Sequence, residues 1–131
     1  MVNVGYVGDR EKVLQAYKQS KVETASPAEL VLMLYDGSLK HMRKAVEYIE
    51  EKDYQGANES LLRTQDIVDE LRFSLDFNTG EIADTLYSIY DFVYSALVTA
   101  NLKKDAEVLE SAIKVMTEIR DAWEEAIRGH D

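Results

Sequence analysis

The sequence predicts an all-α protein, an antiparallel up-down-up-down four-helix bundle with a short N-terminal helical arm. Three observations predict it. Six glycines and a single proline in 131 residues leave few points at which helices break. Apolar residues recur at spacings of three and four, and the segments that carry them are joined by short links, which make consecutive helices antiparallel neighbours. We expect residues 1–25 to form the arm and residues 26–131 to form one bundle domain.

The first bundle helix is expected from Pro27 to about Lys52. The run Ser26-Pro27-Ala28-Glu29 contains three start signals. Ser26 can accept a hydrogen bond from the N–H groups of the first turn, and Pro27 suits the first helical position. Glu29 can act as the partner of Ser26 in a capping box, so this start is well defined.

The second helix is expected to begin after Asp53, which can cap it, and to continue through Leu75. Its apolar positions alternate in spacing between four and three, as expected for a helix with one face on a core. The stripe consists of Ala57, Leu61, Thr64, Val68, Leu71 and Leu75.

The third and fourth helices follow from turn and cap signals. Residues 76–80, Asp-Phe-Asn-Thr-Gly, have the composition of a turn, so a third helix is expected from Glu81 to about Lys103. Asp105 is expected to cap the fourth helix, and Gly129 suits its end. The core face of the fourth helix consists of Leu109, Ala112, Met116, Ile119, Trp123 and Ile127.

Composition excludes several classes of function and compartment. Fifteen basic and twenty-five acidic residues give a net charge of -10, which repels nucleic acid and anionic lipid. The chain has no cysteine, and residues 1–13 lack the apolar core of a signal peptide. The longest apolar run, Leu30 to Tyr35, is far shorter than a membrane span. We therefore expect a cytoplasmic protein without membrane insertion and without a nucleic-acid partner.

The sequence gives no support for enzymatic chemistry, a metal or a cofactor. Di-metal bundle sites use Glu-x-x-His pairs, but Ser38 precedes His41 by three residues and Ile127 precedes His130 by three. There is no glycine-rich phosphate loop and no recognisable nucleophile setting. One alternative remains, because His41 is followed by Met-Arg-Lys: a signalling bundle that transfers phosphate through His41.

Two helices carry more apolar residues than one stripe can hide. The six consecutive residues from Leu30 to Tyr35 point in every direction around the first helix, and a second stripe lies beside the core stripe of the third. Either a broad arc is buried between two neighbours, or an exposed groove binds a partner helix, or the surplus surface makes a homodimer. The candidate groove residues are Leu30, Val31, Met33, Leu34, Tyr87, Tyr90, Tyr94 and Val98.

The N-terminal arm has a short apolar helical face formed by Val13, Leu14 and Tyr17. Such an arm can fold back over the groove and cover it until a partner displaces it, or it can be an ordinary docked terminal helix. The sequence leaves both alternatives open.

Three ordered segments resemble the FliS family of flagellin-specific export chaperones. Residues 24–37, TASPAELVLMLYDG, are similar to the family signature. Residues 80–105, with Ile89-Tyr90-Asp91-Phe92 and the run ANLKKD at their end, are similar to its third helix, and Asp121-Ala122-Trp123 matches near the end. The likeness extends from Leu14 to Ala126. Thr85 stands where the family often has asparagine, and Phe92 stands where a tyrosine is frequent.

The resemblance implies a function that periodicity alone does not. Proteins of this family are helical bundles that bind the disordered C-terminal segment of flagellin, and thereby prevent premature polymerisation in the cytoplasm. The loaded complex is passed to the cytoplasmic domain of the membrane protein that forms the flagellar export gate. An apolar residue and a tyrosine of the arm take part in that step, and Leu14 and Tyr17 occupy the matching positions. No nucleotide or metal is implied.

Overall fold

The computed structural model describes residues 12–13, 15–16 and 25–129, in two compact units, Met1–Leu30 and Val31–Asp131. In the first unit, Val13 is helical and 68% exposed. Helix α2 (Pro27–Glu50) begins there, and Ser26 Oγ accepts the Glu29 N–H at 3.2 Å, as the start signal predicts. Leu14, Tyr17 and His130 lie outside the described residues. The predicted boundary between residues 25 and 26 stays a prediction.

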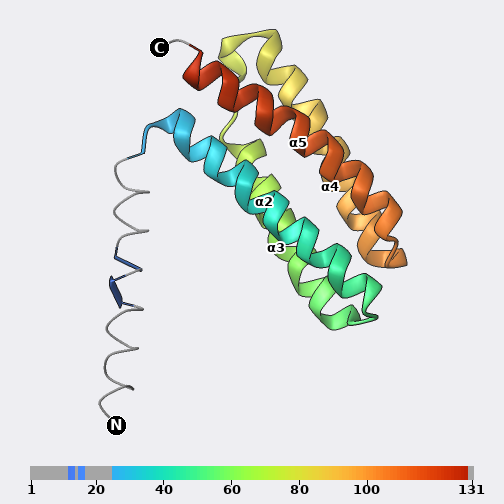
Figure 1. Cartoon of the computed structure of the whole chain (residues 1–131). Helices are drawn as coiled ribbons and strands as arrows, with labels where there is room; N and C mark the ends of the chain where they lie inside the picture. Colours follow the sequence, from blue (N-terminus) through green and yellow to red (C-terminus); the bar gives the residue numbers. More distant parts are fainter. Residues whose placement is uncertain (1–11, 14, 17–24, 130–131) are drawn as a thin grey trace. The chain divides into compact units, whose positions relative to one another are not determined.

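The second unit contains the rest of α2, then α3 (Tyr54–Phe73), the short 3-10 helix η1 (Phe77–Thr79), α4 (Glu81–Lys103) and α5 (Ala106–Arg128). In Figure 1 the four long helices lie side by side, and consecutive helices run in opposite directions. The described ranges contain helices and turns and no strand. The all-α fold class and the four-helix arrangement are therefore confirmed.

The predicted helix caps are present. Asp53 Oδ1 accepts the Gly56 N–H at 3.0 Å at the start of α3. Asp105 Oδ1 accepts the Glu107 N–H at 2.9 Å and the Val108 N–H at 3.4 Å at the start of α5. Each carboxylate satisfies donors that have no partner inside the helix, which fixes where the helix begins.

Two helices end two residues earlier than predicted. α2 ends at Glu50 and not at Lys52, because Lys52 adopts a left-handed conformation with φ 61° that turns the chain into the next cap. α3 ends at Phe73 and not at Leu75, and there Ser74 Oγ donates to the Leu71 carbonyl at 2.9 Å. The earlier end of α3 lengthens the link to α4.

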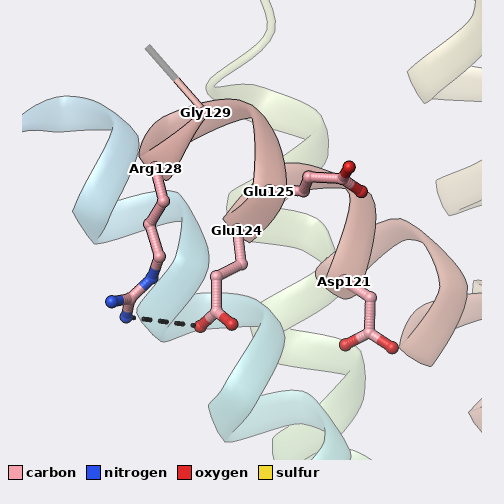
Figure 2. A pocket seen from close by; sticks show the side chains of 5 residues that line it. All are labelled: Asp121, Glu124, Glu125, Arg128 and Gly129. Carbon is pink, nitrogen blue, oxygen red and sulfur yellow. Dashed lines mark ion pairs between the residues drawn. The ribbon is translucent and has the colours of Figure 1, made fainter. Parts of the chain in front are cut away.

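The end of α5 carries mainly acidic side chains. Gly129 donates its N–H to the Glu125 carbonyl at 2.7 Å and ends the helix. Figure 2 shows Asp121, Glu124, Glu125 and Arg128 around a shallow hollow at this end, with Arg128 Nη2 3.6 Å from Glu124 Oε2. An exposed pair of this kind adds little to stability.

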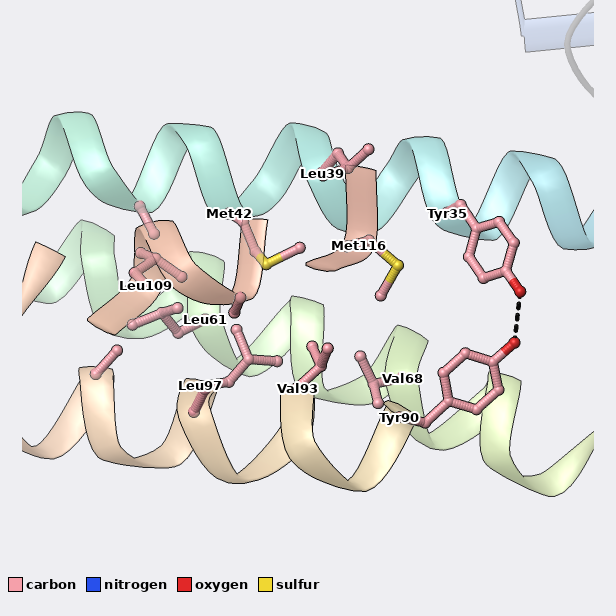
Figure 3. Packing of buried hydrophobic residues seen from close by; sticks show 14 of the residues in the cluster. Tyr35, Leu39, Met42, Leu61, Val68, Tyr90, Val93, Leu97, Leu109 and Met116 are labelled. Carbon is pink, nitrogen blue, oxygen red and sulfur yellow. Dashed lines mark hydrogen bonds between the residues drawn. The ribbon is translucent and has the colours of Figure 1, made fainter. Parts of the chain in front are cut away.

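The core fills the space between the four helices of the second unit. Figure 3 shows Met42 of α2, Leu61 of α3, Leu97 of α4 and Leu109 of α5 pointing toward one another, and all four are 0% exposed. The predicted stripe of α3 is buried apart from Leu75, which is half-buried. Tertiary packing thus follows the spacing of three and four in the sequence.

Polar side chains connect the helices around this core. Arg72 of α3 bonds to Asp69, lies 3.5 Å from Asp91 Oδ1 of α4, and places its guanidinium over the Tyr94 ring at 4.3 Å. Arg120 Nε of α5 donates to Asp36 Oδ1 of α2 at 2.7 Å. These contacts help to fix the register of neighbouring helices. Among the described helices, none combines the length and the apolar character that a membrane span requires.

Candidate functional site

The candidate site lies at the corner where α3 ends and α4 begins. Residues 74–80 link the two helices and include η1. Asp76 Oδ1 accepts the Asn78 N–H at 3.0 Å and starts η1. Gly80 adopts φ 96° and ψ -148°, a conformation that residues with a Cβ rarely reach, so the glycine allows the chain to turn into α4.

An apolar hollow with a volume of about 260 Å³ opens at this corner. Three elements of the second unit contribute most of its wall: the α3–α4 link, the first turns of α4, and α5 near its C-terminal end. We call this site the apolar hollow; its lining residues are Val31, Ser74, Leu75, Asp76, Ile82, Ala83, Leu86, Tyr90 and Trp123. The size suits an apolar anchor side chain of a bound polypeptide better than a cofactor.

Exposed apolar side chains occur in the lining of the apolar hollow and directly beside lining residues in the chain. Ile82, which lines the apolar hollow, is 62% exposed. Phe77 of η1 is 54% exposed and packs edge-on against Tyr87 of α4, with ring centroids 5.9 Å apart. Phe73, beside Ser74 in the chain, is exposed too. Exposed apolar groups gathered at one place are typical of a protein-binding surface.

Tyr90 forms the floor of the apolar hollow, and its hydroxyl is hydrogen-bonded to that of Tyr35. The Tyr90 hydroxyl lies 2.6 Å from that of Tyr35, and either group can donate. Trp123 packs edge-on against the Tyr35 ring, with centroids 6.0 Å apart. Burial raises the pKa of Tyr35 well above its ordinary value, and the hydrogen bond adds to this; burial also raises the pKa of Tyr90. Both rings are therefore neutral near pH 7 and the floor carries no charge.

The structure corrects the prediction for Tyr90. The sequence placed this residue on an exposed stripe, but it is 2% exposed. α4 contacts both α3 and α5, so a broad arc of its surface is buried. This is the alternative in which two neighbours cover the second stripe, and for Tyr90 it is the one the structure supports. Tyr90 remains at the floor of the apolar hollow but is not part of an exposed surface.

The other predicted groove residues are spread over several environments. Val31 is half-buried and lines the apolar hollow, and Tyr87, which follows the lining residue Leu86 in the chain, is 43% exposed. Leu34 and Tyr94 are half-buried and pack against the core. The remaining three do not line it: Met33 and Val98 are half-buried, and Leu30, 36% exposed, belongs to the first unit. The structure thus brings part of the predicted set to one place.

Sequence reasoning missed several residues of this corner. Phe77 was assigned to a turn because of its neighbours, although an aromatic side chain within a turn is itself a signal of exposed apolar surface. Trp123 was assigned to the core face of the fourth helix, and in the structure it is half-buried and also lines the apolar hollow. Leu75 and Ile82 line the apolar hollow too, because the chain bends between them.

A helical bundle that has an apolar hollow and exposed aromatic rings at the same corner has the character of a protein that binds another polypeptide. Comparison with known proteins agrees: the model of the family "Flagellar protein FliS" matches residues 10–130. The chain therefore belongs to the FliS family. It is 43% identical over 113 residues to the flagellar secretion chaperone FliS of Bacillus subtilis (strain 168), covering 86% of this chain and 84% of that one.

Other relatives support the same assignment. The flagellar secretion chaperone FliS of Salmonella typhimurium is 34% identical over 118 residues, which cover 86% of this chain and 87% of the relative. A solved structure described as a flagellar chaperone from bacteria superposes with a TM-score of 0.75 at 21% identity, over 92% of this chain and 98% of that chain, and supports the fold alone. Flagellar secretion chaperones are not a class of enzymes, so the phosphotransfer alternative through His41 is not favoured.

Proposed function

We propose that this chain is a cytoplasmic export chaperone that binds the disordered C-terminal segment of flagellin. Binding prevents premature polymerisation, and the loaded complex is delivered to the flagellar type III export gate. Membership of the FliS family supports the class of function. The observation that carries the proposal is the apolar hollow, whose lining residue Ile82 is exposed, together with the exposed pair Phe77 and Tyr87, which follow the lining residues Asp76 and Leu86 in the chain.

The apolar hollow offers a physical basis for holding a disordered chain. A segment that becomes helical on binding presents apolar side chains every three or four residues, and one of them can enter the apolar hollow, which Ile82 and Trp123 line. Each square ångström of apolar surface removed from water contributes about 25 cal/mol, which offsets the entropy lost on ordering the segment. A ligand that must order itself also dissociates readily, as export requires.

Delivery to the export gate is assigned to the arm. Leu14 and Tyr17 are proposed to contact the cytoplasmic domain of the export-gate membrane protein, on the strength of their match to the family pattern. Neither nucleotide nor metal takes part in this proposal. Gate docking and flagellin capture then use different residues, so each can be disabled separately.

Calorimetric titration of the full chain with a flagellin C-terminal peptide tests the proposal. Ile82→Asp should weaken binding at least about tenfold, because it places a charge at the opening of the apolar hollow. Leu102→Asp is the matched control: Leu102 is another exposed aliphatic residue of α4, 82% exposed, and does not line the apolar hollow. Its affinity should stay within about twofold of the parent chain, as expected for a residue outside the contact.

Two further measurements make the test decisive. A peptide whose apolar residues are replaced by serine should not bind, and the parent titration should show a negative heat-capacity change. Sedimentation of the unloaded chain shows whether the apolar hollow is already occupied in a homodimer, which the peptide would dissociate. Equal affinities of the Ile82→Asp and Leu102→Asp variants would reject the apolar hollow as the binding site.

A further inference from the structure

A second hollow lies between α2 and α3, with a volume of about 210 Å³. We call it the basic hollow; its lining residues are His41, Lys44, Tyr48, Gly56, Glu59, Ser60 and Arg63. It shares no lining residue with the apolar hollow. The rise of about 1.5 Å per residue places His41 roughly 15 Å along α2 from Val31, so the two hollows are separate sites on the second unit.

The close approach of Tyr48 to α3 shapes the wall of the basic hollow. A Cβ atom added to Gly56 would lie 2.8 Å from Tyr48 Cδ1, so only glycine at this position allows the ring to lie against the start of α3. Lys44 Nζ lies 5.9 Å from the centre of the same ring. The Tyr48 ring therefore supports the lysine at the edge of the basic hollow and keeps its charge close to the opening.

The field inside the basic hollow is positive. Burial lowers the pKa of His41, and the charges of Arg63, Lys40 and Lys44 lower it further. Among the described lining residues, Glu59 is the one carboxylate. Three cations thus act on a single half-buried imidazole, which is neutral near pH 7.

These cations differ from three arginines of the second unit that are paired within the chain. Arg72, Arg120 and Arg128 each form an ion pair with a carboxylate of the chain. Within the described ranges, no ion pair engages Lys40, Lys44 or Arg63. A chain with a net charge of -10 has carboxylates in excess, so a group of cations left unpaired around a hollow requires a separate explanation.

We propose that the basic hollow docks an acidic segment of a partner polypeptide, with a carboxylate of that segment bound between Arg63 and Lys44. A guanidinium presents several donors to a carboxylate in a fixed geometry, and a nearby ammonium adds a second charge. The site goes beyond the capture of flagellin, since it is polar where the apolar hollow is not. It gives the chaperone a place for a second protein while its first ligand is bound.

The overall charge of the chain favours an acidic peptide over other polyanions. Nucleic acid and anionic membranes carry dense charge over long distances, and a chain with a net charge of -10 repels them. A short acidic segment experiences chiefly the local field, because charges farther than about 8 Å are screened at physiological salt. The positive field of the basic hollow acts over that short range.

Binding of a labelled hexaglutamate peptide to the full chain, followed by fluorescence anisotropy at physiological salt, tests the proposal. The parent chain should bind hexaglutamate and not hexaglutamine. Arg63→Gln should weaken binding about fivefold or more, because it removes a charged donor. Arg43→Gln is the matched control: it removes the same charge from an exposed residue of α2 that does not line the basic hollow. It should change the affinity less than about twofold, as screening reduces distant charges.

The remaining outcomes also decide the question. Absence of hexaglutamate binding, or equal losses in the two arginine variants, would overturn the proposal. Tighter binding of an oligonucleotide or of anionic vesicles that also depends on Arg63 would overturn it in favour of those partners. The flagellin peptide should bind Arg63→Gln as it binds the parent chain. A loss there would instead make the basic hollow part of the flagellin site, whereas failure of the parent chain to bind flagellin leaves this test unaffected.

Discussion

The middle of the second unit and its α3–α4 corner contain similar apolar side chains in opposite environments. In the middle, Leu61, Leu97 and Leu109 are 0% exposed. At the corner, Phe77 is 54% and Ile82 is 62% exposed. In the middle of the helices, these core-facing side chains pack against neighbouring helices. At the corner two helices end, and the link between them leaves apolar side chains without a covering element.

This difference shows where a small bundle can hold a partner without losing its own stability. An apolar binding site in the middle of the bundle would have to expose core side chains. The dense packing of the core does not tolerate this. The corner can present apolar groups because the core does not depend on them. Tyr90 lies at the border, since it is buried in the core cluster and also forms the floor of the apolar hollow.

The largest expected effect is the contrast between Leu97→Ala and Ile82→Ala, two truncations on the same helix. Leu97→Ala should lower the free energy of unfolding by about 2–5 kcal/mol, because it leaves a cavity in the core. Ile82→Ala should lower it by less than about 1 kcal/mol, because the side chain is largely in water. Urea unfolding followed by circular dichroism measures both. Similar losses would contradict the division into a sealed middle and an open corner.

The substitution Tyr35→Phe tests the border between the packed middle and the open corner. This change leaves the Tyr90 hydroxyl without its partner and should cost about 1–2 kcal/mol at pH 7. Tyr90→Phe should cost a similar amount, and the double variant should cost less than the sum, since one hydrogen bond is lost in every case. Thermal or urea unfolding of the three variants measures the coupling between the two hydroxyls. Strict additivity would show that the pair does not act as one unit.

The same pair predicts how stability responds to alkali. The folded state holds the protons of Tyr35 and Tyr90 more firmly than the unfolded state, because burial raises both pKa values above the ordinary 10.0. The stabilisation is complete below pH 10 and decreases as the pH rises above it, since the unfolded chain then binds fewer protons. Tyr35→Phe should make this decrease shallower. An unfolding series between pH 8 and pH 11 measures the slope.

Much of the fold follows from the sequence because its signals are local. Asp53 and Asp105 cap helices where their positions predict, and the stripes of spacing three and four are buried. Helix ends were less accurate at Lys52 and Leu75. After α2, Lys52 adopts a left-handed conformation, and after α3, Ser74 Oγ donates to the Leu71 carbonyl. Neither feature has a distinctive sequence pattern.

The candidate site was harder to predict because it is not periodic. Periodicity on α4 identifies two apolar stripes but not how far the neighbouring helices cover each one, so Tyr90 was assigned to the surface. The apolar hollow combines Val31 of α2, Leu75 of the α3–α4 link and Trp123 of α5, and their meeting depends on the path of the link through η1. Which residues come together at this corner is determined by tertiary packing, and it cannot be predicted from the spacing of residues in a single sequence.

The smallest expected effect is a difference in stability between substitutions of two phenylalanines at the corner. Phe73 is 84% exposed and is therefore surrounded mainly by water, so Phe73→Ser should change the free energy of unfolding by no more than about 0.5 kcal/mol. Phe77→Ser removes the edge-on contact with Tyr87 and should cost about 0.5–1.5 kcal/mol. Paired urea titrations resolve the difference. If Phe73→Ser were the more costly change, the corner would be held by packing around Phe73, and its apolar groups would be structural and not reserved for a partner.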